Sequence, residues 1–204
     1  MSSSHSNHSA YWNHNAAYHP WILRRAARCP RGRALDIGCG DGLLAQRLAD
    51  AGLDTVGLEP DPVAADRARE RTRELPRVTI LESDLDSFDG APRSFDIVTM
   101  VATLHHMDSR AALGRAVDLL RPGGALLVVG LAANRSVADR AFSAATFPAA
   151  WLGSLVHRET RDVGVRTALA QETLTDIRAL ARDILPGARI RRGLYYRYLL
   201  SWQR

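Results

Sequence analysis

The sequence predicts an α/β protein with a doubly wound, mostly parallel sheet, because short apolar runs alternate with helix-compatible runs along most of the chain. A second observation is a glycine-rich turn at residues 38–42, between the first apolar run and the first helical run. A third is a pair of short runs near the end of the chain, joined tightly at Gly193 as in an antiparallel hairpin. The length of 204 residues suits one domain that buries its core without disulfides or a metal.

The first predicted strand ends in a turn that contains Gly38, Gly40 and Gly42, and a helical run follows. Glycine lets the backbone adopt positive φ and approach an adenosine-type ligand closely. A dinucleotide site would have the spacing G-x-G-x-x-G, but Leu43 stands where its third glycine would be. Asp36, at the end of the strand, would repel a pyrophosphate and attract an ammonium group. The turn therefore favours a ligand that carries an ammonium group.

This combination resembles motif I of the class I methyltransferases that depend on S-adenosylmethionine (SAM). Glu59 closes the second predicted strand about 20 residues beyond the turn, where an acid commonly accepts hydrogen bonds from the two ribose hydroxyls. Asp84 stands just past the third predicted strand, and it resembles the acid that accepts the adenine amino hydrogen at this position in SAM enzymes. Asp86 is the alternative.

Two later segments are also similar to this family. The fourth predicted strand continues into residues 102–108, which resemble the loop beside the methionine moiety in small-molecule methyltransferases. A helix that we expect Ser109 to cap then runs to Leu120, and the turn at 121–124 leads into the fifth strand. Four motifs in this order exclude an ordinary βα turn. The resemblance implies a Rossmann-like, three-layer αβα fold with seven strands, the last of them antiparallel.

The expected elements follow from these patterns. Strands are expected at residues 34–37, 55–58, 78–81, 95–101, 125–129, 188–192 and 194–202. Helices are expected at 43–50, 61–71, 109–120 and 173–185, the last with a capping box that begins at Thr173.

The resemblance also implies which residues bind SAM, with S-adenosylhomocysteine as the product. They are the acids and glycines above together with neighbouring residues: Asp36, Gly38, Cys39, Gly40, Gly42, Glu59, Pro60, Asp84, Leu85, Val101 and Tyr18. We expect Cys39 to be a small buried side chain of the turn and not a reactive thiol. No metal site is expected.

Histidine is the only side chain present whose ordinary pKa lies near neutrality, and the chain contains no lysine. An acceptor that carries a proton needs that proton removed, so His105 and His106 are candidate catalytic bases after the fourth strand. His19 and His157 are further candidates if their segments fold over the pocket. Alternatively, the histidine pair holds the loop by hydrogen bonds.

Two segments could cover the site. Residues 1–10 are rich in Ser, His and Asn and are expected to form a disordered tail before a single domain at 11–204. Aromatic residues crowd 11–30, which is either a lid helix over the cofactor or a helix packed on the sheet. An aromatic-containing insertion at 131–170 lies where this family commonly builds its substrate cover.

The segment after the fourth strand narrows the acceptor. It lacks the Asp/Asn/Ser-Pro-Pro-Tyr/Phe sequence of amino-DNA methyltransferases, the Pro-Cys nucleophile of cytosine-C5 enzymes and the paired glutamates of protein arginine methyltransferases. The expected function is therefore methyl transfer to an O or N atom of a small molecule. The main alternative is a SAM-binding protein without methyl transfer, and an NAD-dependent dehydrogenase is less favoured by the glycine spacing.

The distribution of charge along the chain indicates which kinds of partner to expect. Residues 151–204 carry 10 arginines and 5 acids, whereas 1–150 carry 17 of each. Because the arginines are interspersed with acids, we expect a solvated surface and neither a nucleic-acid nor a membrane partner. The N-terminus lacks the features of a secretory signal, so the expectation is a cytoplasmic monomer or homodimer.

Overall fold

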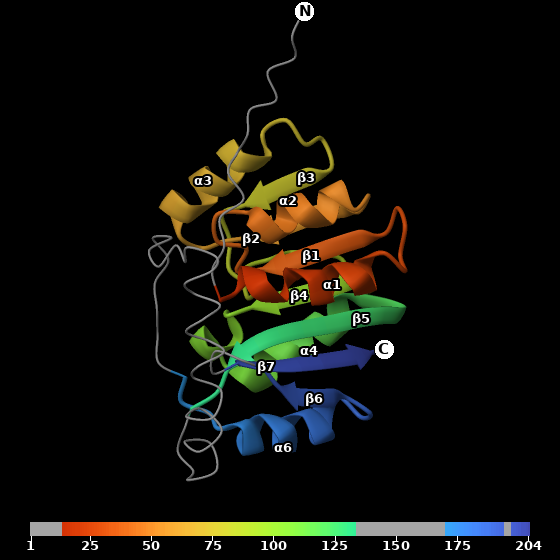
Figure 1. Ribbon diagram of the computed structural model, residues 1–204, viewed down its shortest axis with the longest axis vertical. Helices are drawn as coiled ribbons and strands as arrows, with labels where there is room; N and C mark the ends of the chain where they lie inside the picture. Colours follow the sequence, from red (N-terminus) through yellow and green to blue (C-terminus); the bar gives the residue numbers. More distant parts are fainter. Residues whose placement is uncertain (1–13, 134–169, 194–196) are drawn as a thin grey trace, which may run out of the picture.

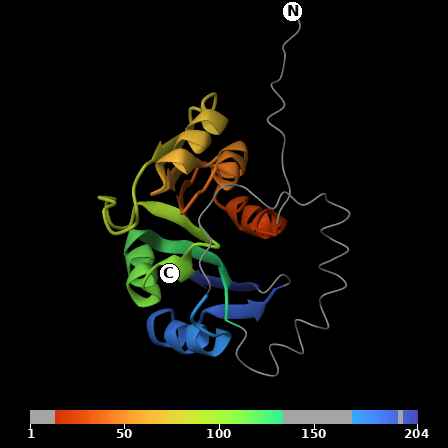
Figure 2. The same cartoon turned by 90° about the vertical axis from the view of Figure 1, so that its left-hand side faces the viewer.

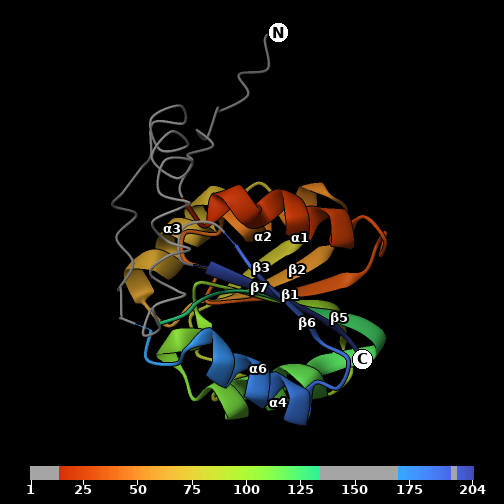
Figure 3. The ribbon, with the colours of Figure 1, turned by 60° about the horizontal axis from the view of Figure 1, so that its bottom comes forward.

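The computed structural model describes residues 14–133, 170–193 and 197–204, which form a seven-stranded sheet between two layers of helices (Figure 1). Helices α1, α2 and α3 cover one face of the sheet, and α4 and α6 cover the other (Figure 3). The strands are β1 (Arg33–Ile37), β2 (Asp54–Leu58), β3 (Val78–Leu81), β4 (Phe95–Val101), β5 (Leu120–Leu131), β6 (Arg189–Arg192) and β7 (Arg197–Gln203). The helices are η1 (Ala16–Tyr18), α1 (His19–Ala26), α2 (Leu43–Asp50), α3 (Pro62–Thr72), η2 (Leu104–His106), α4 (Ser109–Leu119) and α6 (Leu174–Ile184).

The strand order is β3-β2-β1-β4-β5-β7-β6. Strand β7 pairs antiparallel with both β5 and β6, whereas the pairs among the first five strands are all parallel. The predicted seven-stranded α/β fold with an antiparallel last strand is therefore confirmed. The order reverses between β1 and β4, and open α/β sheets bind ligands beyond the carboxyl ends of their strands at such a switch point.

The core lies on both faces of the central strands, as expected for strands that helices cover on each side. On one face, Ile22 and Ala26 of α1 are fully buried in a cluster with Leu48 of α2 and Ile97 of β4. Figure 2 shows α1 beside α2 on this face. Helix α1 therefore packs on the sheet, as in one of the two interpretations of residues 11–30.

Two expected boundaries were wrong. Asp108, and not Ser109, is the N-cap of α4, because its carboxylate accepts a hydrogen bond from the amide of Ala111 at 2.8 Å. Strand β5 begins at Leu120, before the expected turn, and its pairing with β4 shifts register between Phe95 and Ile97. The irregularity accommodates Gly123, whose φ of 81° is in the left-handed region. The capping box at Thr173 is confirmed, with Asp176 as its reciprocal partner.

Some expectations lie outside the described residues. They concern the tail at 1–10, the aromatic residues Tyr11 and Trp12, His157, and the insertion beyond residue 133. Leu131, which we expected to open the insertion, is the last residue of β5 and pairs with Arg197 of β7. Among the described residues, no helix is long and apolar enough to cross a membrane.

Candidate active site

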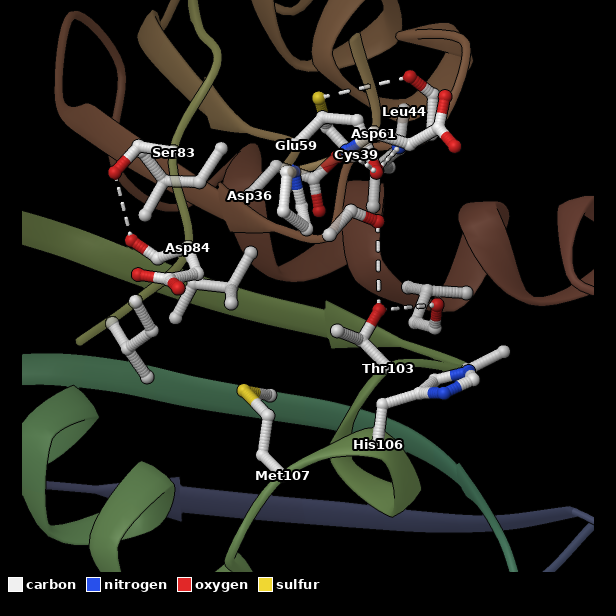
Figure 4. Close-up of a pocket in the computed structure, with 18 of the residues that line it drawn as sticks. Asp36, Cys39, Leu44, Glu59, Asp61, Ser83, Asp84, Thr103, His106 and Met107 are labelled. Atoms are coloured by element: carbon white, nitrogen blue, oxygen red, sulfur yellow. Dashed lines mark hydrogen bonds between the residues drawn. The ribbon is translucent and has the colours of Figure 1, made fainter. Parts of the chain in front are cut away.

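A cavity of about 680 Å³ lies at the carboxyl ends of β1, β2 and β4, at the switch point of the sheet. The residues that follow these strands and β3 form much of its wall, and η1 with the starts of α1, α2, α3 and α4 completes it. In Figure 4, His106 and Met107 lie on the opposite side of this space from Asp36 and Glu59. The lining includes Asn15, Ala16, His19, Asp36, Gly38, Cys39, Gly40, Asp41, Glu59, Pro60, Asp61, Asp84, Leu85, Asp86, Val101, Thr103, His106, Met107 and Asp108.

The glycine turn has the backbone that its sequence requires. Gly38, Gly40 and Gly42 have φ values of 69°, 57° and 80°, which disfavour any residue with a side chain. The space also demands glycine, because a Cβ at Gly38 would overlap the side chain of Thr103 and one at Gly42 would lie 3.0 Å from the Cβ of Ala68. The turn is thus packed between the loop after β4 and helix α3.

Glu59, at the end of β2, is held by two backbone amides. Its Oε2 accepts a hydrogen bond from the amide of Gly40 at 2.9 Å, and its Oε1 accepts one from the amide of Asp61 at 3.0 Å. The residue is 5% exposed and lines the cavity. Each carboxylate oxygen can accept a second hydrogen bond, so Glu59 is a fixed acceptor for two ligand hydroxyls.

Asp36 is the most deeply buried acid of the cavity wall, at 2% exposed. Its Oδ1 accepts a 2.7 Å hydrogen bond from the hydroxyl of Thr99 on β4. Burial raises the pKa of the Asp36 carboxyl to about 7, against the Thr99 hydrogen bond and with a contribution from the charge of Glu59. A cationic group in the cavity would favour the ionised form and be attracted to it.

Asp84 differs from these two acids because its side chain is exposed. Its Oδ1 accepts a hydrogen bond from the amide of Ser87 at 2.8 Å, and this bond is the main cause that lowers the pKa of the carboxyl. Asp84 is therefore an ionised acceptor at the cavity wall. Asp86 also lines the cavity, so both alternatives for the adenine acceptor lie at the site.

The three described histidines that we considered as bases have different environments. His106 lines the cavity and is exposed, whereas His105 does not line it and lies beside His106 with a ring separation of 4.1 Å. His19 is 5% exposed, and its Nδ1 lies 3.0 Å from Nη1 of Arg47. Burial, and then the charge of Arg47, lower the pKa of His19 to about 3. Because a guanidinium can only donate, Nδ1 is the acceptor and the proton of the neutral ring is on Nε2.

Of the predicted site residues that the structure describes, the cavity brings together all but three, the exceptions being Gly42, Tyr18 and His105. Gly42 is the N-cap of α2. The hydroxyl of Tyr18 lies against Gly193, where a Cβ would come within 2.6 Å of it. Cys39 is 8% exposed, its Sγ packs against Gly57, and burial raises the pKa of its thiol, so its prediction as a small buried residue is confirmed.

Sequence reasoning missed several lining residues. Thr103 and Met107 belong to the segment after β4 that we singled out, and their place in that segment was the available signal. Asn15 offered no signal, because it lies far along the chain from the motifs and is held at the cavity as the N-cap of η1 by hydrogen bonds from Arg197 of β7. Asp61 was identified only as the start of α3, where its carboxylate accepts from the amide of Ala64.

Fold and cavity together define an open-sheet α/β protein that binds its ligand at the switch point, beside a glycine turn and fixed carboxylates. A family model described as a methyltransferase domain matches residues 35–126. An uncharacterized methyltransferase of Mycobacterium tuberculosis is 33% identical over 195 residues, which cover 94% of this chain and 96% of that protein. The chain therefore belongs to the methyltransferase family of enzymes, and the resemblance to class I SAM-dependent methyltransferases is confirmed.

Further relatives cover less of the sequence or share only the fold. A ubiquinone biosynthesis O-methyltransferase of Methylococcus capsulatus is 31% identical over 134 residues, or 64% of this chain and 54% of that protein. A SAM-dependent methyltransferase structure from Aquifex aeolicus has a TM-score of 0.62 at 14% identity, covering 91% of this chain and 88% of that chain. The structure of a phosphoethanolamine N-methyltransferase of Haemonchus contortus with SAM has a TM-score of 0.62 at 22% identity. The match covers 86% of this chain and 38% of that chain.

Proposed function

We propose that this chain binds SAM over the glycine turn and transfers its methyl group to an O or N atom of a small molecule. The observation that carries the proposal is the carboxylate of Glu59, which the amides of Gly40 and Asp61 fix in the cavity wall. A rigid acceptor for two vicinal hydroxyls suits a ribose, and a rigid site loses less entropy on binding. Similarity to an O-methyltransferase and to the fold of an N-methyltransferase supports both acceptor atoms.

The other carboxylates complete the cofactor site. Asp36 is buried in the cavity wall and is suited to the ammonium group of SAM, since a nearby cation favours its ionised form. Asp84 is suited to the amino group of the adenine, with Asp86 as the alternative. The remaining proposed cofactor-binding residues follow from the family resemblance: Gly38, Cys39, Gly42, Pro60, Leu85, Val101 and Tyr18.

SAM supplies a sulfonium-bound methyl group that a lone pair of the acceptor attacks in line, and the leaving thioether needs no acid. The task of the protein is to position the acceptor and to receive its proton. His106 is the proposed base, because it is an exposed imidazole at the cavity and lies across from Asp36 and Glu59 (Figure 4). His19 is not the proposed base, because its Nδ1 already accepts a hydrogen bond from Arg47 and its protonated Nε2 can only donate one.

The proposed covers of the acceptor are residues 131–170 and the part of residues 11–30 that precedes α1, through the aromatic residues in both segments. Covering the site would exclude water and orient the acceptor. A cytoplasmic location and a monomeric or homodimeric state are also proposed, as the sequence predicts.

Calorimetry with SAM, followed by an assay of thioether release over a panel of small phenols, carboxylates and amines, tests this function. Glu59→Ala should weaken SAM binding by about 1.5 to 3 kcal/mol, because it removes charge-assisted hydrogen bonds. Unchanged affinity would overturn the ribose assignment. Binding of NADH without binding of SAM would revive the dehydrogenase, and SAM binding without release on any acceptor would favour a non-methylating protein.

A further inference from the structure

Arg71 of α3 binds the glycine turn through two of its nitrogens. Its Nε donates to the backbone carbonyl of Asp41 at 2.9 Å, and its Nη2 donates to the carboxylate Oδ2 of the same residue at 2.8 Å. Asp41 stands between Gly40 and Gly42 and lines the cavity. The side chains of Arg71 and Asp41 are each 14% exposed, so this ion pair is shielded from solvent more than a surface pair.

A second contact joins α3 to the same turn. Ala68 lies three residues before Arg71, which places both residues on one face of the helix. A Cβ at Gly42 would lie 3.0 Å from the Cβ of Ala68, so helix and turn touch there without space for a side chain. The turn is therefore held on its outer side by α3, while Glu59 holds the amide of Gly40 from the β2 side.

The form of the contact depends on arginine. A guanidinium presents several donors in a planar fork, so it can bind a carbonyl and a carboxylate of one residue together, whereas an ammonium is a point charge. The fork ties both the backbone and the side chain of Asp41, between two glycines in the left-handed region. Glycines have more conformational freedom than other residues, so an unrestrained turn would lose entropy when a ligand orders it.

We propose that Arg71 is a positioning residue for the cofactor, which holds the glycine turn in its binding conformation before SAM arrives. The inference rests on the proposed placement of SAM over this turn. Arg71 does not line the cavity, so it acts through Asp41 and not by touching the ligand. Its loss should weaken SAM binding and leave turnover at saturating SAM nearly unchanged.

The test compares Arg71→Gln and Arg71→Lys with the control Arg73→Gln, which removes exposed ion pairs to Glu70 and Glu74 at the end of the same helix. Calorimetry at a temperature where every variant is folded should show a dissociation constant for SAM raised by about tenfold in Arg71→Gln, or about 1.4 kcal/mol. Arg71→Lys should resemble Arg71→Gln, because it keeps the charge and loses the fork. Arg73→Gln should match the wild type.

Two further measurements separate positioning from a structural role. In the protein without SAM, amide hydrogen exchange at residues 40–42 should be faster in Arg71→Gln than in Arg73→Gln. The KM for SAM should rise while kcat stays within about twofold of the wild type, as expected when only binding of the cofactor is affected. A fall in melting temperature with an unchanged dissociation constant would overturn the inference. So would rescue of full affinity by Arg71→Lys.

Glu59→Ala in the same series keeps the inference distinct from the proposed function. If Glu59→Ala also binds SAM normally, the placement of SAM over the turn is wrong. If Glu59→Ala weakens binding and Arg71→Gln does not, only the inference about Arg71 fails.

Discussion

The hydroxyl of Thr99 on β4 donates a 2.7 Å hydrogen bond to the carboxylate of Asp36 on β1, across the two strands at the switch point of the sheet. This bond partly stabilises a carboxylate that burial would otherwise keep protonated to still higher pH. The pKa of Asp36 in the free protein consequently lies at about 7, where small changes in pH alter its charge. Both ligand binding and stability should therefore depend on this one group.

The affinity for SAM should rise as the pH increases toward 7.5. Below a pH of about 7 the free protein holds a proton on Asp36, and binding of the ammonium group must displace it. Calorimetry between about pH 5.5 and pH 7.5 is informative, because an α-amino group has a pKa of about 7.7 to 8.0 and stays mostly protonated over this range. The control Asp36→Asn should bind more weakly and without this rise. An affinity of the wild type that is constant over the range would contradict the assignment of Asp36.

The raised pKa of Asp36 also predicts that the free energy of unfolding falls as the pH rises, whereas the affinity for SAM increases. The pKa of Asp36 is raised in the folded protein from its ordinary value of 3.8 to about 7, so the folded state holds the proton more tightly than the unfolded state. The stabilisation that this tighter proton binding gives the folded state is fully present below a pH of about 4 and is lost as the pH rises to about 7. Asp36→Asn cannot ionise and can still accept the Thr99 hydrogen bond, so without SAM it should melt above the wild type at pH 8. A lower melting temperature of Asp36→Asn at pH 8 would contradict the burial argument.

The glycine turn and the strand-end acids could be predicted from the sequence because they are local. A positive φ at Gly38 or Gly40 leaves a direct trace in residue type, and an apolar run that ends in Asp36 or Glu59 shows where a strand meets a ligand. The start of β5 at Leu120 could not be predicted, because the pairing with β4 overrides the turn tendency of the Pro-Gly-Gly sequence. Neither could Arg71 as a partner of Asp41, since helix and turn meet only in the folded chain.

His106 and His105 are adjacent and differ in access to the cavity, so they provide a matched pair. If His106 receives the proton of the acceptor, His106→Ala should lower kcat by on the order of 10²-fold and leave the affinity for SAM unchanged. His105→Ala should change kcat little. The measurement is steady-state turnover on an acceptor found in the panel, with melting temperatures of both variants as a check on folding. Equal losses in the two variants would indicate that the pair only holds the loop.

The aromatic residues Tyr11 and Trp12 of the proposed N-terminal cover precede the described part of the chain. The residues of this segment from 14 onward belong to the packed fold. Asn15 accepts hydrogen bonds of 3.0 and 2.6 Å from the Nε and Nη2 of Arg197 on β7, and Ile22 of α1 is fully buried. Removal of residues 1–13 therefore leaves these contacts in place and tests the cover without removing α1.

If residues 1–13 contribute a lid, their deletion should lower turnover or weaken ligand binding while the melting temperature stays nearly unchanged, since water then reaches the reacting groups. Asn15→Ala is the matched structural variant, because it breaks the link between η1 and β7 and should lower the melting temperature by removing hydrogen bonds to a charged group. Melting temperature, SAM affinity and turnover are measured on the same preparation of each protein. A deletion variant with full activity would reject the lid, and one with a large fall in melting temperature would show that the segment packs as part of the core.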